Sequence, residues 1–141
     1  MAQRAFLSER DKGAGGERVM EQVVYKDVLT DADIQELYKI TGTFHDSCID
    51  FCEYHDDTLR LELYTPWGCN VELLFTGNVA YSINLSFLAE RGDPDWWRGT
   101  IAIKDGFVYL YEGCANKTID EIKCKICWFQ GQSLRYRVIP Y

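Results

Sequence analysis

Residues 57–87 read DTLRLELYTPWGCNVELLFTGNVAYSINLSF and carry the strongest secondary-structure signal of the chain. Apolar and polar residues alternate in three successive runs, at 59–63, 71–75 and 79–87. Successive side chains of a β-strand point to opposite faces, so a period of two is typical of strands with one buried face. Pro66-Trp67-Gly68 and Gly77-Asn78 separate the runs and are turn-forming sequences. The stretch therefore predicts three consecutive antiparallel strands.

One helix is predicted ahead of these strands, over residues 31–41. Thr30 and Asp33 have the spacing of a capping box, with Asp in place of the usual Glu. Gly42 supplies a C-terminal stop. The apolar residues of the helix fall at i, i+3 and i+4 and form one stripe, at Ile34, Leu37 and Tyr38. We expect this stripe to pack on the sheet.

Further strands are predicted on both sides of the central stretch. One is expected at about 48–54, and two more, at 100–104 and 107–112, flank Asp105-Gly106, a type I′ hairpin signal. Residues 118–122 suggest a helical turn. A last hairpin is expected from strands at 123–130 and 134–139, joined by Gly131-Gln132-Ser133.

The elements together predict an α+β fold. We expect about seven to nine antiparallel strands in a strongly curved sheet or partial barrel, with one or two helices packed against it. Residues 1–19 are expected to be a polar tail, at most partly helical, and residues 20–141 a single domain. The predicted buried face, covered in part by Ile34 and Leu37, consists of Leu59, Leu61, Leu63, Val71, Leu73, Phe75, Tyr81, Ile83 and Leu85.

Composition narrows the classes of partner. The chain has 141 residues, 47% of them apolar, and its 15 Lys and Arg against 22 Asp and Glu give a formal charge of −7. This balance argues against nucleic acid or an anionic membrane as the main partner, and it suits a basic protein partner. The sequence shows no apolar run of membrane-spanning length and no secretory signal, so we expect a cytoplasmic protein with reduced cysteines.

Histidine and cysteine residues raise the question of a metal site. The segment from His45 to His55 has the spacing H-x2-C-x3-C-x2-H, and a second pair lies at Cys124 and Cys127. Zinc needs four ligands that converge at about 2.0–2.3 Å. On an extended strand the two cysteines of the first segment share a face but lie about 13 Å apart. We therefore expect six free thiols, no metal and no cofactor; zinc stays an alternative only if these segments are not strands.

His45 and Asp46 are the best candidates for general-base catalysis, because an imidazole and a carboxylate are adjacent at the start of a strand. Catalysis also requires a cleft and a third group. The structural alternative is that Asp46 or Ser47 fixes a turn and His45 bonds a backbone carbonyl. The chain has no G-x-S-x-G, P-loop, dinucleotide-binding or H-E-x-x-H motif, so an enzyme is not expected.

A loop at 91–98 interrupts the strands and is the candidate protein-binding site. Tryptophan and arginine are enriched in interface hot spots. The residues expected to bind a partner are Asp93, Asp95, Trp96, Trp97 and Arg98. The alternative for at least one tryptophan is that it plugs the end of the sheet. If the loop is not the interface, the open sheet face is the next candidate, around Arg60, Glu62, Tyr64 and Glu72.

Three short motifs follow the capped helix: Phe44-His45-Asp46-Ser47-x-Ile49, then Leu59-x-Leu61-x-Leu63, then Trp67-x3-Val71-x-Leu73-x-Phe75-x-Gly77-Asn78-Val79. This order, over residues 30–111, resembles a group of small bacterial α+β proteins, some of which are similar to immunity proteins of polymorphic toxin systems. The resemblance implies no catalytic residues. It implies a module that binds and occludes a toxin domain, often a nuclease with a basic active site, which an acidic chain would suit.

Three functions stay open on the sequence. The first is a protein-binding module of the immunity type. The second is a structural or regulatory domain with another partner. The third is a small-molecule-binding or hydrolytic protein that uses a cleft near His45, and a deep pocket containing His45 and other titratable groups would favour it.

Overall fold

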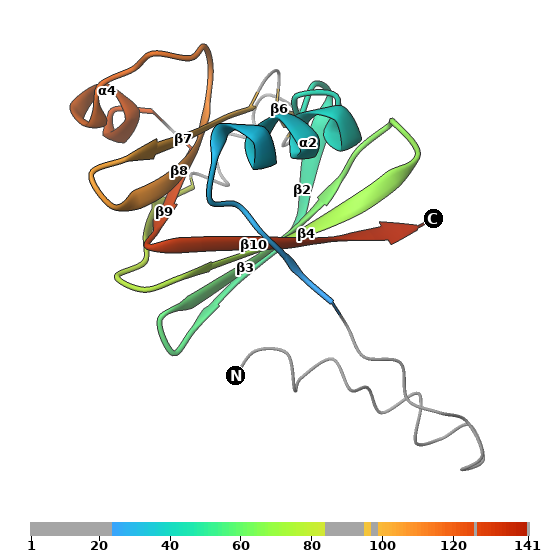
Figure 1. Ribbon diagram of the computed structural model, residues 1–141, viewed down its shortest axis with the longest axis horizontal. Helices are drawn as coiled ribbons and strands as arrows, with labels where there is room; N and C mark the ends of the chain where they lie inside the picture. Colours follow the sequence, from blue (N-terminus) through green and yellow to red (C-terminus); the bar gives the residue numbers. More distant parts are fainter. Residues whose placement is uncertain (1–23, 84–94, 97–98, 126, 141) are drawn as a thin grey trace.

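The computed structural model describes residues 24–83, 95–96, 99–125 and 127–140, and within them the chain forms antiparallel strands in two sheets with two helices (Figure 1). The first sheet has six strands in the order β1-β10-β4-β3-β2-β6, and the second has four in the order β5-β9-β8-β7. The elements in chain order are β1 (Lys26–Asp27), α2 (Asp31–Thr41), β2 (Ser47–His55), β3 (Thr58–Tyr64), β4 (Cys69–Thr76), β5 (Ala80–Ser82), β6 (Asp95–Trp96), β7 (Gly99–Lys104), β8 (Phe107–Glu112), α4 (Ile119–Lys123), β9 (Trp128–Gly131) and β10 (Ser133–Pro140).

The predicted helix is confirmed as α2, with the predicted bounds. The capping box is present, because the Thr30 side chain accepts a hydrogen bond from the Asp33 N–H and the Asp33 carboxylate accepts one from the Thr30 N–H. Gly42 ends the helix in the left-handed conformation, with φ of 61°. Ile34 and Leu37 are buried, as expected. The predicted tail at 1–19 lies outside the described residues.

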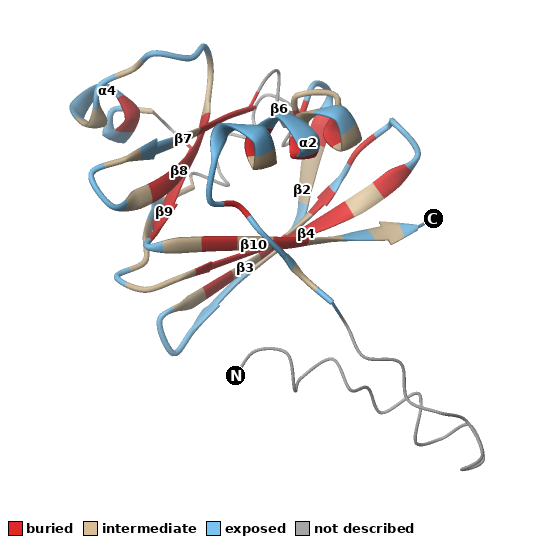
Figure 2. Ribbon diagram, viewed as in Figure 1, coloured by how far each residue is buried: buried red, intermediate tan, exposed pale blue. Residues whose placement is uncertain are grey.

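The core lies between the two sheets and α2. Figure 2 shows buried segments of β3, β4, β8, β9 and β10 converging at the centre of the molecule. Six of the predicted core residues are confirmed as buried: Leu59, Leu61, Leu63, Val71, Leu73 and Phe75. The prediction is wrong for Tyr81, which is 39% exposed, and Ile83 is only partly buried. Leu85 lies outside the described residues.

The expected single curved sheet or partial barrel is wrong, because the strands divide between two sheets. Among the described strands the chain passes from one sheet to the other four times. After β4 it leaves the meander at Gly77, and β5 pairs with β9 in the second sheet. The expected last hairpin is also wrong, because β9 belongs to the second sheet whereas β10 pairs with β4. The predicted strand at 123–130 is longer than the observed strand β9. The first residue of the predicted strand, Lys123, is the last residue of α4.

Two of these sheet changes, from β4 to β5 and from β9 to β10, meet at one corner. The Gln132 N–H donates to the Gly77 carbonyl at 2.8 Å. A Cβ on Gly131 would lie 3.0 Å from the Cβ of Phe75, and a Cβ on Gly77 would lie 2.6 Å from Oε1 of Gln132. The two connections pass so closely here that a Cβ at either glycine would displace its neighbours.

In the second sheet, the β7–β8 hairpin and the neighbouring helix agree with the predictions from local sequence. The β7–β8 hairpin is confirmed, with both Asp105 and Gly106 at positive φ as a type I′ turn requires. Its outer face is covered by α4, whose Ile122 packs with Tyr109 and Tyr111. Thr118 caps α4, so the expected helical turn is confirmed. In the described part of the chain no helix is long and apolar enough to cross a membrane.

Candidate protein-binding surface

Strand β2 is an edge strand for most of its length. One side pairs with β3 from Cys48 to His55. On the other side, among the described residues, only Ser47 and Cys48 are paired, with the short strand β6. In an antiparallel strand every second residue directs its N–H and C=O away from a given neighbour. Beyond Cys48, β2 thus presents a row of backbone groups that no described strand pairs.

A β-bulge at Asp50 sets which side chains of β2 point to which face. The register with β3 shifts between Ile49 and Phe51. As a result Cys52 and Tyr54 lie opposite the core residues of β3, whereas Phe51 and Glu53 lie on the outer face of the sheet. Cys48 and Cys52 therefore point to opposite faces. The expectation that they share a face is wrong, because a period of two does not hold across a bulge.

The open side of β2 is acidic. Residues 45–57 read HDSCIDFCEYHDD and contain five carboxylates but no Lys or Arg. Asp57 has a structural role, because its carboxylate accepts the N–H groups of Asn78 and Val79 at 2.8 and 2.9 Å. We use the name acidic edge for the open side of β2 with its four other carboxylates, all exposed: Asp46, Asp50, Glu53 and Asp56.

Two exposed aromatic side chains flank this edge, one on each face of the sheet. Phe51 is 38% exposed, and the guanidinium of Arg60 lies over its ring at 4.4 Å from the centroid. Tyr54 is 47% exposed, and its ring centroid is 6.0 Å from that of Tyr81. Neighbours that already restrain a side chain lower the entropy cost of ordering it in a complex. Phe51 and Tyr54 are therefore suited to act as aromatic anchors.

A buried carboxylate holds Arg60 in place. Glu72 is fully buried on the outer face of the first sheet. Its carboxylate accepts hydrogen bonds from Arg60 Nη1 at 2.9 Å, Arg137 Nε at 2.6 Å and the Tyr25 hydroxyl at 2.5 Å. Burial, followed by the hydrogen bond to Glu72, raises the pKa of Tyr25 above its usual value, so this phenol stays a donor. The cluster fixes the guanidinium that stacks on Phe51.

The loop that leads into β2 has an unusual backbone. Gly42, Thr43 and Phe44 have φ of 61°, 56° and 59°, a left-handed run that is unfavourable for Thr and Phe. Phe44 is buried and packs edge-to-face on Tyr38, with ring centroids 6.4 Å apart. The Thr43 carbonyl accepts the Gly99 N–H at 3.2 Å and so ties the loop to β7. This packing offsets the backbone strain.

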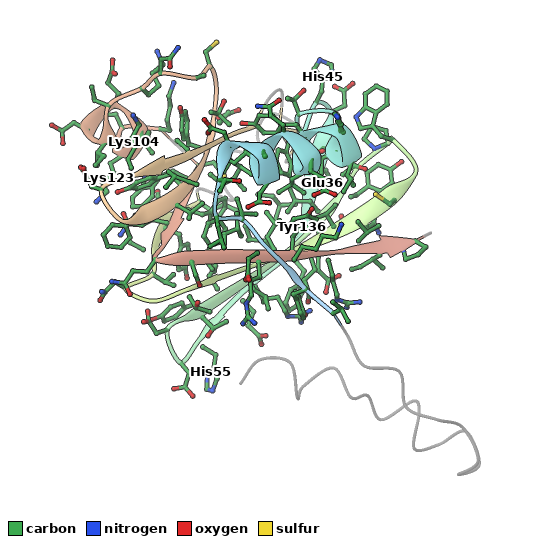
Figure 3. All side chains as sticks on the ribbon, in the orientation of Figure 1. Glu36, His45, His55, Lys104, Lys123 and Tyr136 are labelled. Carbon is green, nitrogen blue, oxygen red and sulfur yellow. The ribbon has the colours of Figure 1, made fainter. Side chains whose placement is uncertain are left out.

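The loop presents His45 and Asp46 at the start of the acidic edge. Nδ1 of His45 lies 3.1 Å from Oδ2 of Asp46, and both side chains are largely exposed. The His45 carbonyl accepts a hydrogen bond from Trp67 Nε1 at 3.0 Å. Figure 3 shows His45 and His55 far apart, so the two histidines mark the opposite ends of β2. They cannot share one metal ion.

The structure brings the backbones of the two sequence-predicted candidates together. In the β2–β6 ladder, Ser47 is opposite Trp96 and Cys48 is opposite Asp95. Residues 95–96 therefore run beside the segment that follows His45 and Asp46. Asp93, Trp97 and Arg98 lie outside the described residues, and the side chains of Asp95 and Trp96 do too.

Sequence reasoning missed Trp67 as a surface residue. It is 55% exposed and lies against Gly42, at the same corner as His45. Its position in a Pro-Trp-Gly turn was the available signal, because turns lie at the surface. The acidic edge and its two aromatic residues were missed as well, since the sequence does not say which strand is at the edge.

Two features of the described residues bear on metal binding and on a ligand cleft. No group of three or more His, Cys, Asp or Glu side chains among them could hold a metal ion, and none of the six cysteines forms a disulfide bond. A shallow cavity of about 360 Å³ is lined by Lys104, Asp105, Thr118, Ile119 and Asp120. It lies on the second sheet, away from His45 (Figure 3).

No family model, no curated protein and no solved structure matches this chain. The function has to be argued from the acidic edge and its surroundings.

Proposed function

We propose that this chain is a protein-binding module that occludes the surface of a basic protein partner. The observation that carries the proposal is the combination on β2 of an open backbone edge with two exposed, restrained aromatic residues, Phe51 and Tyr54. Aromatic residues of this kind are frequent interface anchors. The carboxylates around them specify the sign of the partner's charge and favour fast association.

The resemblance to immunity proteins supports a narrower form of the proposal. A toxin domain that cleaves nucleic acid must carry a basic surface, and the acidic edge is complementary to such a surface. Occlusion requires only tight binding and no catalytic group in this chain. The exposed His45–Asp46 pair and Trp67 then extend the contact beyond the start of β2.

The test compares two variants of equal charge. The edge variant is Asp50→Asn/Glu53→Gln/Asp56→Asn, and the control variant is Asp27→Asn/Asp105→Asn/Asp120→Asn, whose sites are exposed and lie on β1, the β7–β8 turn and α4. Each removes three carboxylates. Proteins retained from a lysate of the native host by the wild-type chain and the control, but not by the edge variant, are then expressed and assayed.

The proposal predicts a retained protein with a net positive charge whose activity is blocked by a stoichiometric amount of the wild-type chain. The control variant should block it equally, and the edge variant should need at least about tenfold more protein, a loss of about 1.4 kcal/mol. If the edge and control variants retain and block the same proteins equally, the acidic edge is not the binding surface. An activity that persists in the bound complex would contradict occlusion.

A further inference from the structure

We infer that the partner contributes an extended segment which pairs with β2 between Asp50 and His55 as an additional strand. This inference rests on the proposed function and specifies how the partner is held. Strand addition draws its affinity from main-chain hydrogen bonds and its specificity from alternate side chains. Both components can be read from the described residues.

In the described part of the chain, the outer sides of β2 beyond Cys48 and of β10 beyond Tyr136 have no paired strand, and the other sheet edges are short or capped. The Ile101 N–H on the outer side of β7 donates to the Tyr38 hydroxyl at 2.8 Å, and the Gly99 N–H of that strand donates to Thr43. Strands β1 and β5 have only two and three residues. Helix α2 and its loop thus cap β7, a usual protection of an edge. No described element does the same for β2 beyond Cys48.

The side chains of β2 define the sequence of the added strand. On the outer face Glu53 lies opposite Arg60, with 4.0 Å between its Oε1 and Nη2 of Arg60, and Phe51 lies opposite Glu62. On the inner face Cys52 and Tyr54 lie next to the core. A paired strand alternates its side chains between these two faces. The matching segment therefore alternates basic residues with apolar ones and spans about six residues, roughly 20 Å.

The acidic side chains and the bulge also protect the edge against wrong partners. A second copy of β2 would bring carboxylates against carboxylates, and like charges directly opposite one another are destabilising. A protective role alone does not account for Phe51 and Tyr54, because exposed aromatic residues promote association. The two features together select a basic strand and reject self-association.

The experiment uses three synthetic decapeptides. The first alternates Lys and Val, the second alternates Glu and Val, and the third is the Lys-Val peptide with N-methyl groups on every second residue, which removes the N–H donors of one edge. Binding to the isotope-labelled full chain is followed by NMR, together with amide hydrogen exchange. The edge variant and the control variant are titrated in parallel.

We expect the Lys-Val peptide to bind with a dissociation constant below about 1 mM. The Glu-Val peptide, the N-methylated peptide and the edge variant should each weaken binding at least about tenfold. Exchange should slow at alternate amides of Asp50–His55, the signature of a new ladder.

Strand addition would be overturned if N-methylation did not weaken binding of the Lys-Val peptide. It would also be overturned if the bound peptide protected no alternate amides of β2. The absence of binding, or slower exchange caused by self-association of the chain, would have the same consequence. Each of these results leaves the proposed function to be decided by the capture experiment, which uses the partner itself. A failed capture experiment can be told apart from a failed peptide titration, because the two experiments use different ligands.

Discussion

Gly42 shows how one residue joins the helix to the corner beside the acidic edge. It has positive φ, and a Cβ there would lie 2.6 Å from Nε1 of Trp67. We expect Gly42→Ala to lower the free energy of unfolding by about 1–2 kcal/mol from the left-handed backbone alone, and by more from the contact with Trp67. Urea titration of the single and double variants measures this. In a Trp67→Ala background only the backbone cost should remain, and equal costs in both backgrounds would contradict the contact.

The burial of Glu72 could not be predicted from the sequence. This residue occupies a polar position of an alternating strand, so the open face was its expected location, with Arg60, Glu62 and Tyr64. It is buried because Tyr25 and Arg137, 47 and 65 residues away in the chain, reach it. Contacts of such sequence separation depend on strand order, which local alternation does not contain.

Removal of the Glu72 charge should be costly. We expect Glu72→Gln to lower the free energy of unfolding by about 3–5 kcal/mol, because two guanidinium groups lose a buried partner. Glu62→Gln is the matched control. Glu62 also contacts Arg60 but is partly exposed, so its loss should cost less than about 1 kcal/mol. Similar losses for the two variants in denaturant titration would show that Glu72 is not the centre of the cluster.

At the scale of the element, the cap of α2 makes a pH-dependent contribution. Hydrogen bonds from the Leu29 N–H and from Thr30 hold the pKa of Asp33 below its ordinary value of 3.8. The carboxylate therefore stabilises the helix fully above pH 3.8, and this stabilisation is lost as the pH falls through the lowered pKa.

Asp33→Asn should remove that part of the acid dependence. The free energy of unfolding, measured by urea titration between neutral and acid pH, should fall less steeply in the variant below pH 3.8. An Ile103→Val substitution, at an exposed position on β7, serves as a control with the wild-type slope. Identical slopes for Asp33→Asn and the wild type would mean that the capping box does not form in solution.

The elements that the sequence predicted well are those with local signals. The capping box and Gly42 define α2, and Asp105-Gly106 defines the β7–β8 turn. The changes of sheet at Gly77 and Gln132 have no such signal, because a glycine in a turn serves a hairpin and a crossing equally. The bulge at Asp50 becomes visible only in the register of β2 with β3.

The same reason limited the prediction of the binding surface. His45 and Asp46 were found because an imidazole and a carboxylate are adjacent in sequence. Their position beside residues 95–96 depends on the β2–β6 pairing, which is non-local. The acidic composition of residues 45–57 is visible in the sequence. That these residues form a strand near the edge of a sheet follows only from the strand order of the fold.

At the scale of the whole molecule, one apolar cluster joins the two sheets and α2. It includes Leu61 and Leu73 of the first sheet and Phe129 of the second. We expect Leu61→Ala or Leu73→Ala to lower the free energy of unfolding by about 2–5 kcal/mol. Leu29→Ala, at an exposed position, should cost less than about 0.5 kcal/mol.

Because the core is shared, the two sheets should unfold together. Leu73→Ala should shift the circular dichroism and tryptophan fluorescence transitions to the same lower denaturant concentration. Two separated transitions, with only one of them moved by the substitution, would mean that the sheets are independent. A loss below about 1 kcal/mol for Leu73→Ala would show that the buried face is misassigned.

The central claim is that the open, acidic side of β2 binds a basic partner. The most direct measurement is the dissociation constant of the purified partner for the edge variant and for the control variant, by calorimetry at two salt concentrations. We predict that Asp50→Asn/Glu53→Gln/Asp56→Asn weakens binding at least about tenfold and reduces its salt dependence, while the control variant binds like the wild type. Equal dissociation constants for the two variants at both salt concentrations would contradict the claim.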